Sequence, residues 1–494
     1  MHLGVVSRTI GLLLVVLAAV GALPLAMDYA SEQPTAPWAW MIAVAVGSGL
    51  LLMVVGRRGW QRQAGPREAA AITVGSWLAL AAVAACGLRL AIPEATYAEC
   101  WFEAMSGLTT CGASAFGERL PIESFTPGVK LWRALLQWMG GIGIIALGLV
   151  LLPMLAAGTS LNLFRSESSG LGMDRLTPRL ADTVRFIVLY NLLLNALLFA
   201  ALSAAGVGWF DALCFALTTV STGGFANYSN GVTGLGNPLA EWVLCLGMLL
   251  GALNFVLVVA ALRGQPGPLW RSEEVRAYFA VLLLAAAAVA LILSTSGLYD
   301  RDPHAALRHA AFAVVSIGTS SGHTLGFDRH PLGWEGWPAA ATVILLALML
   351  GVGCSGSTAG GIKMQRLLVL AKMAGAARRR FIEPAVVAPL SLDGRPLPPA
   401  QQFTVITWVV CAAFSWFLGT LLLVCLAPVD LASAGSMVLS ALTNVGPAFG
   451  AFGPSHSAQA AGPLGMVLLS LLMLLGRLEF LAVIALLSAR AWRR

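Results

Sequence analysis

The strongest constraint on this chain is a series of long apolar runs, many of them about 20 residues or longer. A helical run of that length crosses the hydrocarbon core of a membrane. The chain of 494 residues is 58% hydrophobic and only 11% charged, which is far from a soluble globular composition. The pattern therefore predicts an all-α polytopic membrane protein with about ten spans and argues against a soluble fold.

The predicted spans follow from the apolar runs and the charges that flank them. We expect them at residues 3–26, 38–55, 69–92, 129–152, 180–205, 238–262, 278–297, 337–370, 402–427 and 464–487. Basic residues gather after the even-numbered spans, and cytoplasmic loops carry the excess of Lys and Arg. Both termini are therefore predicted to be cytoplasmic. The net charge of +7 fits this bias and does not by itself indicate nucleic acid binding.

Four short polar stretches, each containing a glycine near its end, lie between pairs of predicted spans. They read L-T-T-C-G-A at 108–113, A-L-T-T-V-S-T-G-G-F-A-N at 216–227, S-I-G-T-S-S-G-H at 316–323 and L-T-N-V-G-P at 442–447. Ordinary surface turns are the alternative interpretation, but these stretches are too apolar for open solvent. Four copies of one motif on one side of the membrane predict four re-entrant segments around a common axis.

The plan of span, re-entrant segment and span recurs four times after two additional spans. Residues 1–68 hold the two N-terminal helices. The four units are expected at 69–155, 180–263, 273–372 and 400–494. Repeats of one orientation arise when each unit crosses the membrane an even number of times. The predicted architecture is a pseudo-fourfold arrangement around one pore.

Re-entrant segments of this kind suit a cation. The C-terminal end of a short helix carries about half a negative charge. Backbone carbonyls beyond that end can replace the water around an ion, and glycine allows the backbone angles that this requires. No Asp or Glu adjoins the four glycines, so a purely acidic filter is disfavoured. The predicted filter residues are Thr110, Cys111, Gly112, Ser221, Thr222, Gly223, Ser320, Ser321, Gly322, Asn444, Val445 and Gly446.

The eighth predicted span contains a stretch that a uniform helix would not use, G-V-G-C-S-G-S-T-A-G-G at 351–361. We interpret it as an intramembrane loop that blocks the pore and moves to open it; close helix packing through small residues is the alternative. Arg477 lies in the middle of the tenth span, where a charge is expensive and by default functional. A structural salt bridge is the alternative role for Arg477. The predicted gating residues are Gly351, Gly353, Ser355, Gly356, Ser357, Thr358, Gly360, Gly361, Lys363 and Arg477.

Several of these motifs resemble a known family. V-S-T-G-G-F at 220–225 and N-V-G-P-A-F-G at 444–450 resemble the second and fourth filter sequences of the Trk/Ktr/HKT superfamily of potassium transporters. Q-W-M-G-G-I-G at 137–143 and G-A-L-N-F at 251–255 resemble the inner helices that follow the first two filters. The two extra N-terminal spans make the chain more similar to a TrkH-type membrane subunit than to eight-span relatives.

The resemblance implies an ion and a function. In this superfamily, glycine at all four filter positions accompanies potassium passage, so Gly112 implies potassium as the substrate. Ala448 stands where the fourth motif usually has glycine, but Gly446 is in place. The resemblance also implies a gating loop at 351–361, followed by a basic residue at the position of Lys363. The family carries an arginine in its last inner helix, which matches Arg477. The implied function is potassium uptake across the cell inner membrane, without a cofactor in this chain.

The resemblance also implies partners. The sequence has no P-loop and no dinucleotide fingerprint, so nucleotide control must come from another chain. The family implies a cytosolic TrkA-like nucleotide-binding subunit that docks on basic loops, including Lys372 and residues 378–380, and a homodimer in the lipid bilayer. Topology alone also accounts for those basic residues.

Two other functions are alternatives to potassium conduction. An alternating-access carrier coupled to protons or sodium needs paired intramembrane acids, which are nearly absent. An enzyme needs a nucleophile with a base, or metal ligands, at one depth. The eight cysteines form no C-x-x-C pair and the six histidines show no metal-ligand spacing. A transporter and not an enzyme is therefore expected.

Overall fold

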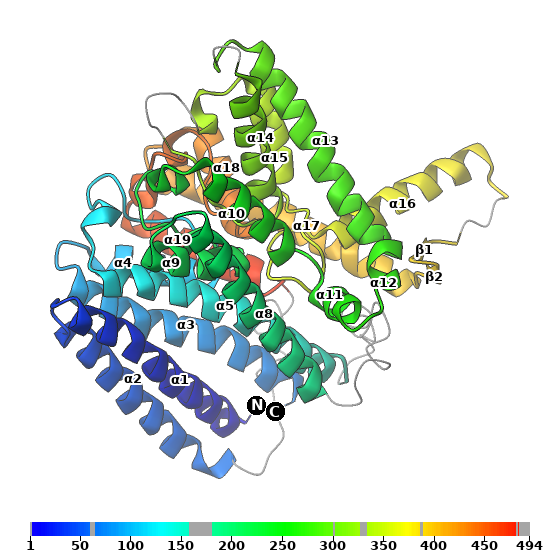
Figure 1. Cartoon of the computed structure of the whole chain (residues 1–494). Coiled ribbons are helices and arrows are strands. Elements are labelled where there is room, and N and C mark those ends of the chain that lie inside the picture. Colours follow the sequence, from blue (N-terminus) through cyan, green and yellow to red (C-terminus); the bar gives the residue numbers. More distant parts are fainter. Residues whose placement is uncertain are drawn as a thin grey trace.

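The computed structural model describes residues 2–59, 65–157, 180–299, 302–326, 333–385, 389–480 and 483, and these residues are mostly helical (Figure 1). The helices are α1 (Leu3–Ala30), α2 (Ala36–Val55), α3 (Pro66–Ala91), α4 (Tyr97–Leu108), α5 (Pro127–Ala157), α8 (Leu180–Ala204), α9 (Trp209–Val220), α10 (Pro238–Gly251), α11 (Phe255–Leu262), α12 (Gly267–Arg271), α13 (Glu273–Thr295), α14 (Pro303–Gly318), α15 (Ala339–Leu348), α16 (Met364–Ile382), α17 (Pro399–Leu426), α18 (Leu431–Thr443) and α19 (Gly462–Arg477). The short strands β1 (Ser391–Leu392) and β2 (Arg395–Pro396) pair antiparallel.

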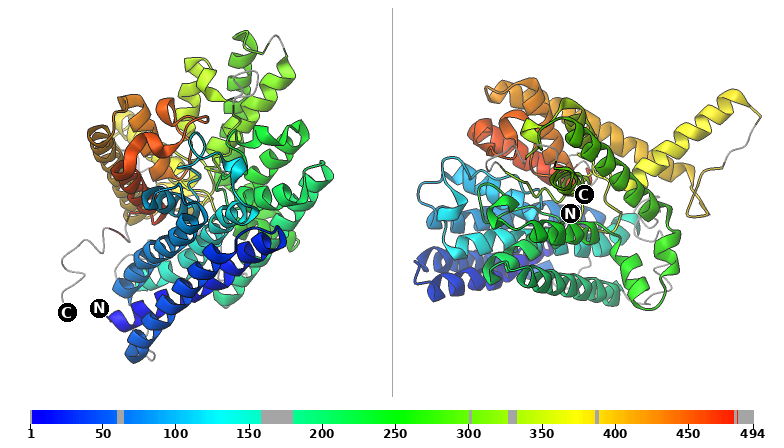
Figure 2. Two further views of the ribbon diagram at one scale, coloured as in Figure 1. Left: turned by 90° about the vertical axis from the view of Figure 1, so that its left-hand side faces the viewer. Right: turned by 45° about the horizontal axis from the view of Figure 1, so that its top comes forward.

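The N-terminal helices α1 and α2 form a hairpin at one edge of the molecule, against α3 and α5 (Figures 1 and 2). Asp28, near the end of α1, is buried and accepts three hydrogen bonds. The donors are Trp38 Nε1 at 2.7 Å, Thr126 Oγ1 at 3.0 Å and the Gly128 amide at 2.6 Å. Because the last two belong to the start of α5, this carboxylate satisfies orphan groups at the helix N-terminus and fastens the hairpin to α5.

Four short helices each pack between two neighbouring helices, in the same order along the chain. The helix α4 contacts α3 and α5, α9 contacts α8 and α10, α14 contacts α13 and α15, and α18 contacts α17 and α19. Contacts between these groups join α5 to α9, α10 to α14, and α19 to α4. The helix α4 has 12 residues and α9 has 12, which is about 18 Å of helix and too short to cross a membrane.

Three of the predicted spans are interrupted. The run at 238–262 is divided into α10 and α11, with a bend of 99° at Ala252–Asn254. Asn254 Oδ1 accepts hydrogen bonds from the Val256 and Leu257 amides and so caps the new helix. The run at 337–370 is divided into α15 and α16, as its glycines indicated. The run at 464–487 is helical only to Arg477 in the described residues, and Glu479 and Phe480 have positive φ.

Seven helices of the described residues are long and apolar enough to cross a membrane, and the bent pair α10–α11 makes an eighth. This is fewer than the predicted ten spans: the run at 337–370 is divided into α15 and α16, and α5, which covers the run at 129–152, is not among those counted. The basic residues between the predicted spans at 129–152 and 180–205, namely Arg165, Arg175 and Arg179, lie outside the described residues, as do the residues from 484 onward. The described part of the chain is thus mostly helical with seven or eight candidate spans.

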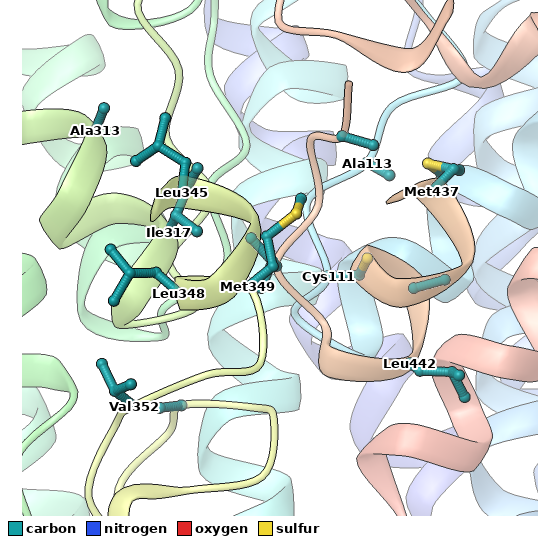
Figure 3. Close-up of a cluster of buried hydrophobic side chains, with 14 of the residues drawn as sticks. Cys111, Ala113, Ala313, Ile317, Leu345, Leu348, Met349, Val352, Met437 and Leu442 are labelled. Atoms are coloured by element: carbon teal, nitrogen blue, oxygen red, sulfur yellow. The ribbon is translucent and has the colours of Figure 1, made fainter. Parts of the chain in front are cut away.

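The largest hydrophobic core joins residues that are distant in sequence (Figure 3). Ile317 of α14 and Leu345 of α15 lie on one side, and Cys111, Met437 and Leu442 lie on the other. Each of these side chains is buried. Apolar packing therefore surrounds the ends of the short helices, where the polar motifs begin.

The helix α16 extends away from the body of the molecule, and β1–β2 follow it (Figure 1). The hairpin returns to the start of α13. There the Glu273 amide donates to Asp393 Oδ1 at 2.6 Å, and the Asp393 amide donates to Glu273 Oε1 at 3.0 Å. Lys372 of α16 forms an ion pair with Glu273 and donates to the Ser391 carbonyl at 2.7 Å. The hairpin is thus attached to both α13 and α16.

Candidate ion pathway

Each short helix begins with groups that satisfy its free amides. Thr96 and Glu99 form a capping box at α4, Asp302 caps α14 and Asp430 caps α18. The helix α9 starts after Gly208 without a side-chain cap. The C-terminal ends of all four helices are buried, and the polar motifs follow them directly. Carbonyls at these ends carry the partial negative charge of the helix dipole.

The four motifs share one backbone conformation. Thr110, Thr222, Ser320 and Asn444 are left-handed, with φ between 51° and 53°. The residue that follows each of them donates its amide to a carbonyl five residues earlier. These bonds run from Cys111 to Ser106 at 2.9 Å, from Gly223 to Thr218 at 2.8 Å, from Ser321 to Ser316 at 2.9 Å and from Val445 to Ser440 at 3.0 Å. The four segments are therefore structurally equivalent, residue by residue.

Four glycines close these segments into a ring. Gly112, Gly224, Gly322 and Gly446 have φ of 87°, 82°, 73° and 102°. A Cβ atom added to any of them would approach within 3.0 Å of a carbonyl oxygen of the next segment. The oxygens belong in turn to Gly223, Ser321, Val445 and Cys111, so the last segment returns to the first. Only glycine combines this backbone angle with so close an approach.

This geometry shifts the second motif by one residue. The sequence-based choice of Ser221, Thr222 and Gly223 aligned Gly223 with the other three glycines. In the structure Gly224 occupies the position equivalent to Gly112, Gly322 and Gly446, and Gly223 corresponds to Cys111. The doubled glycine made the two alignments indistinguishable in sequence. We use the name ring segments for 110–112, 222–224, 320–322 and 444–446.

Different side chains support three of the four junctions of the ring. Between the first and second segments, Gln137 Nε2 donates to the Gly223 carbonyl at 2.6 Å. Between the second and third, Thr219 Oγ1 lies 2.9 Å from His323 Nε2, and both side chains are buried. Between the third and fourth, Trp334 Nε1 donates to the Ala448 carbonyl at 3.1 Å. The ring is thus held by its surroundings as well as by its own backbone.

The loop 351–361 lies against the ends of the short helices. Thr358 Oγ1 lies 3.1 Å from both the Val220 and the Gly251 carbonyls. The Val352 amide donates to the Gly318 carbonyl at 2.9 Å, and the Gly360 amide donates to Ser320 Oγ at 2.6 Å. A Cβ added to Gly360 would approach the Thr443 carbonyl within 3.0 Å. The loop therefore packs directly beside the ring.

The glycines of this loop have distinct environments. Gly351, Gly356 and Gly361 have positive φ, whereas Gly353 packs against the Ala359 side chain. Ser357 Oγ donates to the Cys354 carbonyl at 2.6 Å and closes a turn inside the loop. The Gly356 carbonyl accepts from the Phe255 amide at 3.2 Å at the bend between α10 and α11.

Arg477 reaches this loop from the end of α19. Its Nη1 donates to the Thr358 carbonyl at 2.9 Å, and the side chain is buried. Its Nε and Nη2 have no hydrogen-bond partner among the described residues. Glu479, two residues on, instead pairs with Arg366 at 2.7 Å. The arginine thus contacts the loop by a charge-assisted hydrogen bond, and no ion pair in the described residues joins it to Glu479.

Glu274 also supports the loop, and Lys363 follows it. The Ser355 amide donates to Glu274 Oε1 at 2.6 Å, near the start of α13. Lys363 follows the loop with φ of 68° and leads into α16. Glu274 adjoins Glu273, which holds the β1–β2 hairpin. The loop is therefore connected to the hairpin through two consecutive residues.

Sequence inspection missed several residues near the ring. Glu103 of α4 and Arg133 of α5 form an ion pair at 2.7 Å whose side chains are 0% and 1% exposed. Both are charged residues inside apolar segments, and that signal is the same one that identified Arg477. Gln137 was noticed only as part of a helix motif. Its contact with the second ring segment depends on tertiary packing and is not encoded in spacing.

The whole chain is similar to proteins of one kind. The family described as "TrkH: Cation transport protein" matches residues 39–493. The Trk system potassium uptake protein TrkH of Salmonella typhimurium is 30% identical over 500 residues, with 100% of both chains covered. The Trk system potassium uptake protein TrkI of Halomonas elongata is 31% identical, with 99% of this chain and 97% of the relative covered.

The fold is similar as well. The crystal structure of the potassium transporter TrkH from Vibrio parahaemolyticus matches with a TM-score of 0.88 and 27% sequence identity, over 100% of both chains. The resemblance that the filter-like motifs indicated is confirmed by these matches.

Proposed function

Since the chain belongs to the TrkH family of cation transport proteins, we propose that it takes up potassium across the cytoplasmic membrane as the ion-conducting subunit of a Trk system. The relatives are Trk potassium uptake proteins, and ion transporters of this kind are not enzymes, which confirms the transporter prediction. The chain is a multi-pass membrane protein. Potassium is its substrate and not a resident cofactor.

The closed ring of four segments carries this proposal. In the proposed function, potassium passes along the axis of the ring and exchanges its water for backbone carbonyls. The buried C-terminal ends of α4, α9, α14 and α18 add a favourable potential for a cation. Their placement supports four span–segment–span units at 69–155, 180–263, 273–372 and 400–494, in pseudo-fourfold order after the helices of 1–68.

The filter in this proposal follows the ring register. It consists of Thr110-Cys111-Gly112, Thr222-Gly223-Gly224, Ser320-Ser321-Gly322 and Asn444-Val445-Gly446. Ser221 lies one residue before the second segment, where its Oγ donates to the Leu217 carbonyl at 2.7 Å. In this proposal Ser221 ends the short helix and does not bind the ion.

The loop 351–361 is the proposed gate. Its hydrogen bonds to the ends of α9 and α14 support a position across the route that an ion would take from the ring to the cytoplasm. Arg477 supports the closed position through the Thr358 carbonyl, and its charge raises a barrier to cations. The glycines with positive φ provide positions where the loop can change conformation.

The proposed partners act from the cytoplasm. A TrkA-like nucleotide-binding subunit would dock on the basic surface that includes Lys372 and residues 378–380, and both termini would face the same compartment. We further propose a homodimer in the cell inner membrane. The attachment of the β1–β2 hairpin to α13, one residue from the Glu274 contact with the loop, supports a route from that surface to the gate.

An alternating-access carrier coupled to protons or sodium is the alternative, and uptake into proteoliposomes separates the two. Purified wild type and Arg477→Ala are compared for potassium, rubidium and sodium entry, with and without a protonophore. The proposal expects potassium and rubidium to enter in preference to sodium, independently of the proton gradient. Entry that stops when the proton gradient collapses favours the carrier, and equal entry of the three ions contradicts the proposal. If Arg477→Ala shows flux and the wild type shows none, the wild-type gate is closed in the absence of the partner subunit.

A further inference from the structure

The second ring segment is held by a side chain from α5, which precedes it by about 85 residues. Gln137 Nε2 donates to the Gly223 carbonyl at 2.6 Å, and Gln137 Oε1 accepts from the Phe225 amide at 3.1 Å. The two bonds bracket Gly224, whose backbone approaches the third segment. Gln137 is completely buried. One amide side chain therefore fixes both sides of a ring glycine.

Arg133 lies one turn before Gln137 on α5 and contacts the same segment. Its Nη1 donates to the Ala226 carbonyl at 2.7 Å, and its guanidinium lies over the Phe225 ring, 4.3 Å from the centroid. An arginine over an aromatic face gains a cation–π contact in addition to its hydrogen bond. Arg133 thus holds Phe225 and Ala226, the two residues that follow the second ring segment.

The opposite edge of the Arg133 guanidinium connects to the first ring segment. Arg133 Nε donates to Glu103 Oε1 at 2.7 Å. Glu103 also accepts from Ser114 Oγ at 3.0 Å and from the Ala115 amide at 2.9 Å, just after Gly112. Each partner of this buried pair therefore holds the backbone that follows one ring segment. The pair thus links the backbone that follows the two segments through a continuous set of buried hydrogen bonds.

We propose that Gln137 and Arg133, with Glu103, are positioning residues that set the spacing between the first two ring segments and thereby the ion selectivity of the ring. The proposal rests on the potassium-conducting function above. Selectivity by carbonyls depends on the number and placement of the oxygens around the ion. A buried network whose members are all satisfied resists the displacements that would admit a different ion.

The geometry of Arg133 explains why a lysine cannot replace it. The planar guanidinium directs Nε and Nη1 to different segments, whereas an ammonium group is a single point charge. Gln137 similarly needs one donor and one acceptor. These requirements provide conservative substitutions that keep charge or volume while they remove the link between segments.

The test uses the full-length protein in proteoliposomes and measures the potassium-to-sodium uptake ratio together with total cation flux. Gln137→Met and Arg133→Lys are each expected to lower the ratio about tenfold, while total flux changes much less. The matched controls are Gln402→Met, at the start of α17, and Arg119→Lys, whose side chain is 48% exposed and pairs with Glu99 at the start of α4. Both controls are expected to keep the wild-type ratio.

The outcomes separate this inference from the proposed function. A wild type without potassium preference contradicts the proposed function itself. A selective wild type, with Gln137→Met and Arg133→Lys equally selective and correctly folded, overturns the positioning role alone. If Arg133→Lys does not fold, the neutral pair Arg133→Met with Glu103→Gln removes the uncompensated buried charge and allows the ratio to be measured. An unchanged ratio in that pair also overturns the inference.

Discussion

The ring segments and the loop 351–361 use the same residue types, glycine with serine and threonine, but they are held in different ways. Each ring segment repeats one backbone hydrogen bond and one close approach to its neighbour. The loop has no such repetition; single contacts connect it to Val220, Gly318, Ser320 and Arg477. Cooperative, equivalent contacts favour one fixed geometry, whereas separate contacts can be exchanged one at a time. We therefore expect the ring segments to select the ion and the loop 351–361 to move.

The largest effect is expected from a substitution that breaks the ring. Gly322→Ala places a Cβ against the Val445 carbonyl at a residue with φ of 73°, so the segment must move or the protein fails to assemble. We expect potassium uptake by cells that depend on this protein to be abolished. Gly297→Ala is the matched control, since Gly297 has φ of 78° and nothing within 4 Å. Normal uptake by Gly322→Ala would show that the ring tolerates displacement as the loop does.

A smaller effect of opposite sign is expected from the loop. Arg477→Ala removes the hydrogen bond to the Thr358 carbonyl and the charge beside it. Hydrogen bonds of charged groups contribute about 1.5–3 kcal/mol. Without this bond the closed state is less stable, so the population of the open state and the potassium flux should rise about tenfold or more. Flux into proteoliposomes measures this, with Arg271→Ala, exposed at the end of α12, as the control. Unchanged or lower flux in correctly inserted protein would remove Arg477 from the gate.

The smallest effect on transport is expected away from both regions. Asp28→Ala leaves Trp38 Nε1, Thr126 Oγ1 and the Gly128 amide without their acceptor. We expect a loss of about 2 kcal/mol in the free energy of unfolding, with the potassium-to-sodium ratio unchanged. Thermal unfolding in detergent measures the first quantity, and Gln33→Ala in the same turn is the exposed control. A changed ratio with unchanged stability would mean that the N-terminal hairpin acts on the ring.

The sequence predicted the long helices well where an apolar run is also an uninterrupted helix. The run at 38–55 became α2 and the run at 402–427 became α17, each with ends shifted by only a few residues. Hydropathy does not record direction, however, so the bend of 99° before Asn254 and the end of α19 at Arg477 were not predicted. Asn254 was the sequence signal for the bend, since an amide side chain inside an apolar run can cap a new helix.

The backbone of the ring was predicted in part, and its role as an ion filter stays a prediction. Three of the four ring glycines were identified by their motifs, and the fourth was displaced by one residue because Gly223 and Gly224 adjoin. Contacts such as that of Arg133 with Glu103 join residues 30 positions apart on different helices. Their pairing depends on how α4 and α5 pack, which spacing along the chain does not specify. A charged residue inside an apolar segment is a signal for Glu103 and for Arg133 separately. It does not show that the two residues form an ion pair.

The most direct test of the central claim, that the ring of four segments selects the ion, is the potassium-to-sodium uptake ratio of Gly224→Ser. Gly224 has φ of 82° and approaches the Ser321 carbonyl. Gly206→Ser is the control, because Gly206 has φ of 91° and nothing within 4 Å. The account predicts that Gly224→Ser loses potassium preference or flux while Gly206→Ser keeps both. Selective, undiminished potassium uptake by folded Gly224→Ser would contradict it.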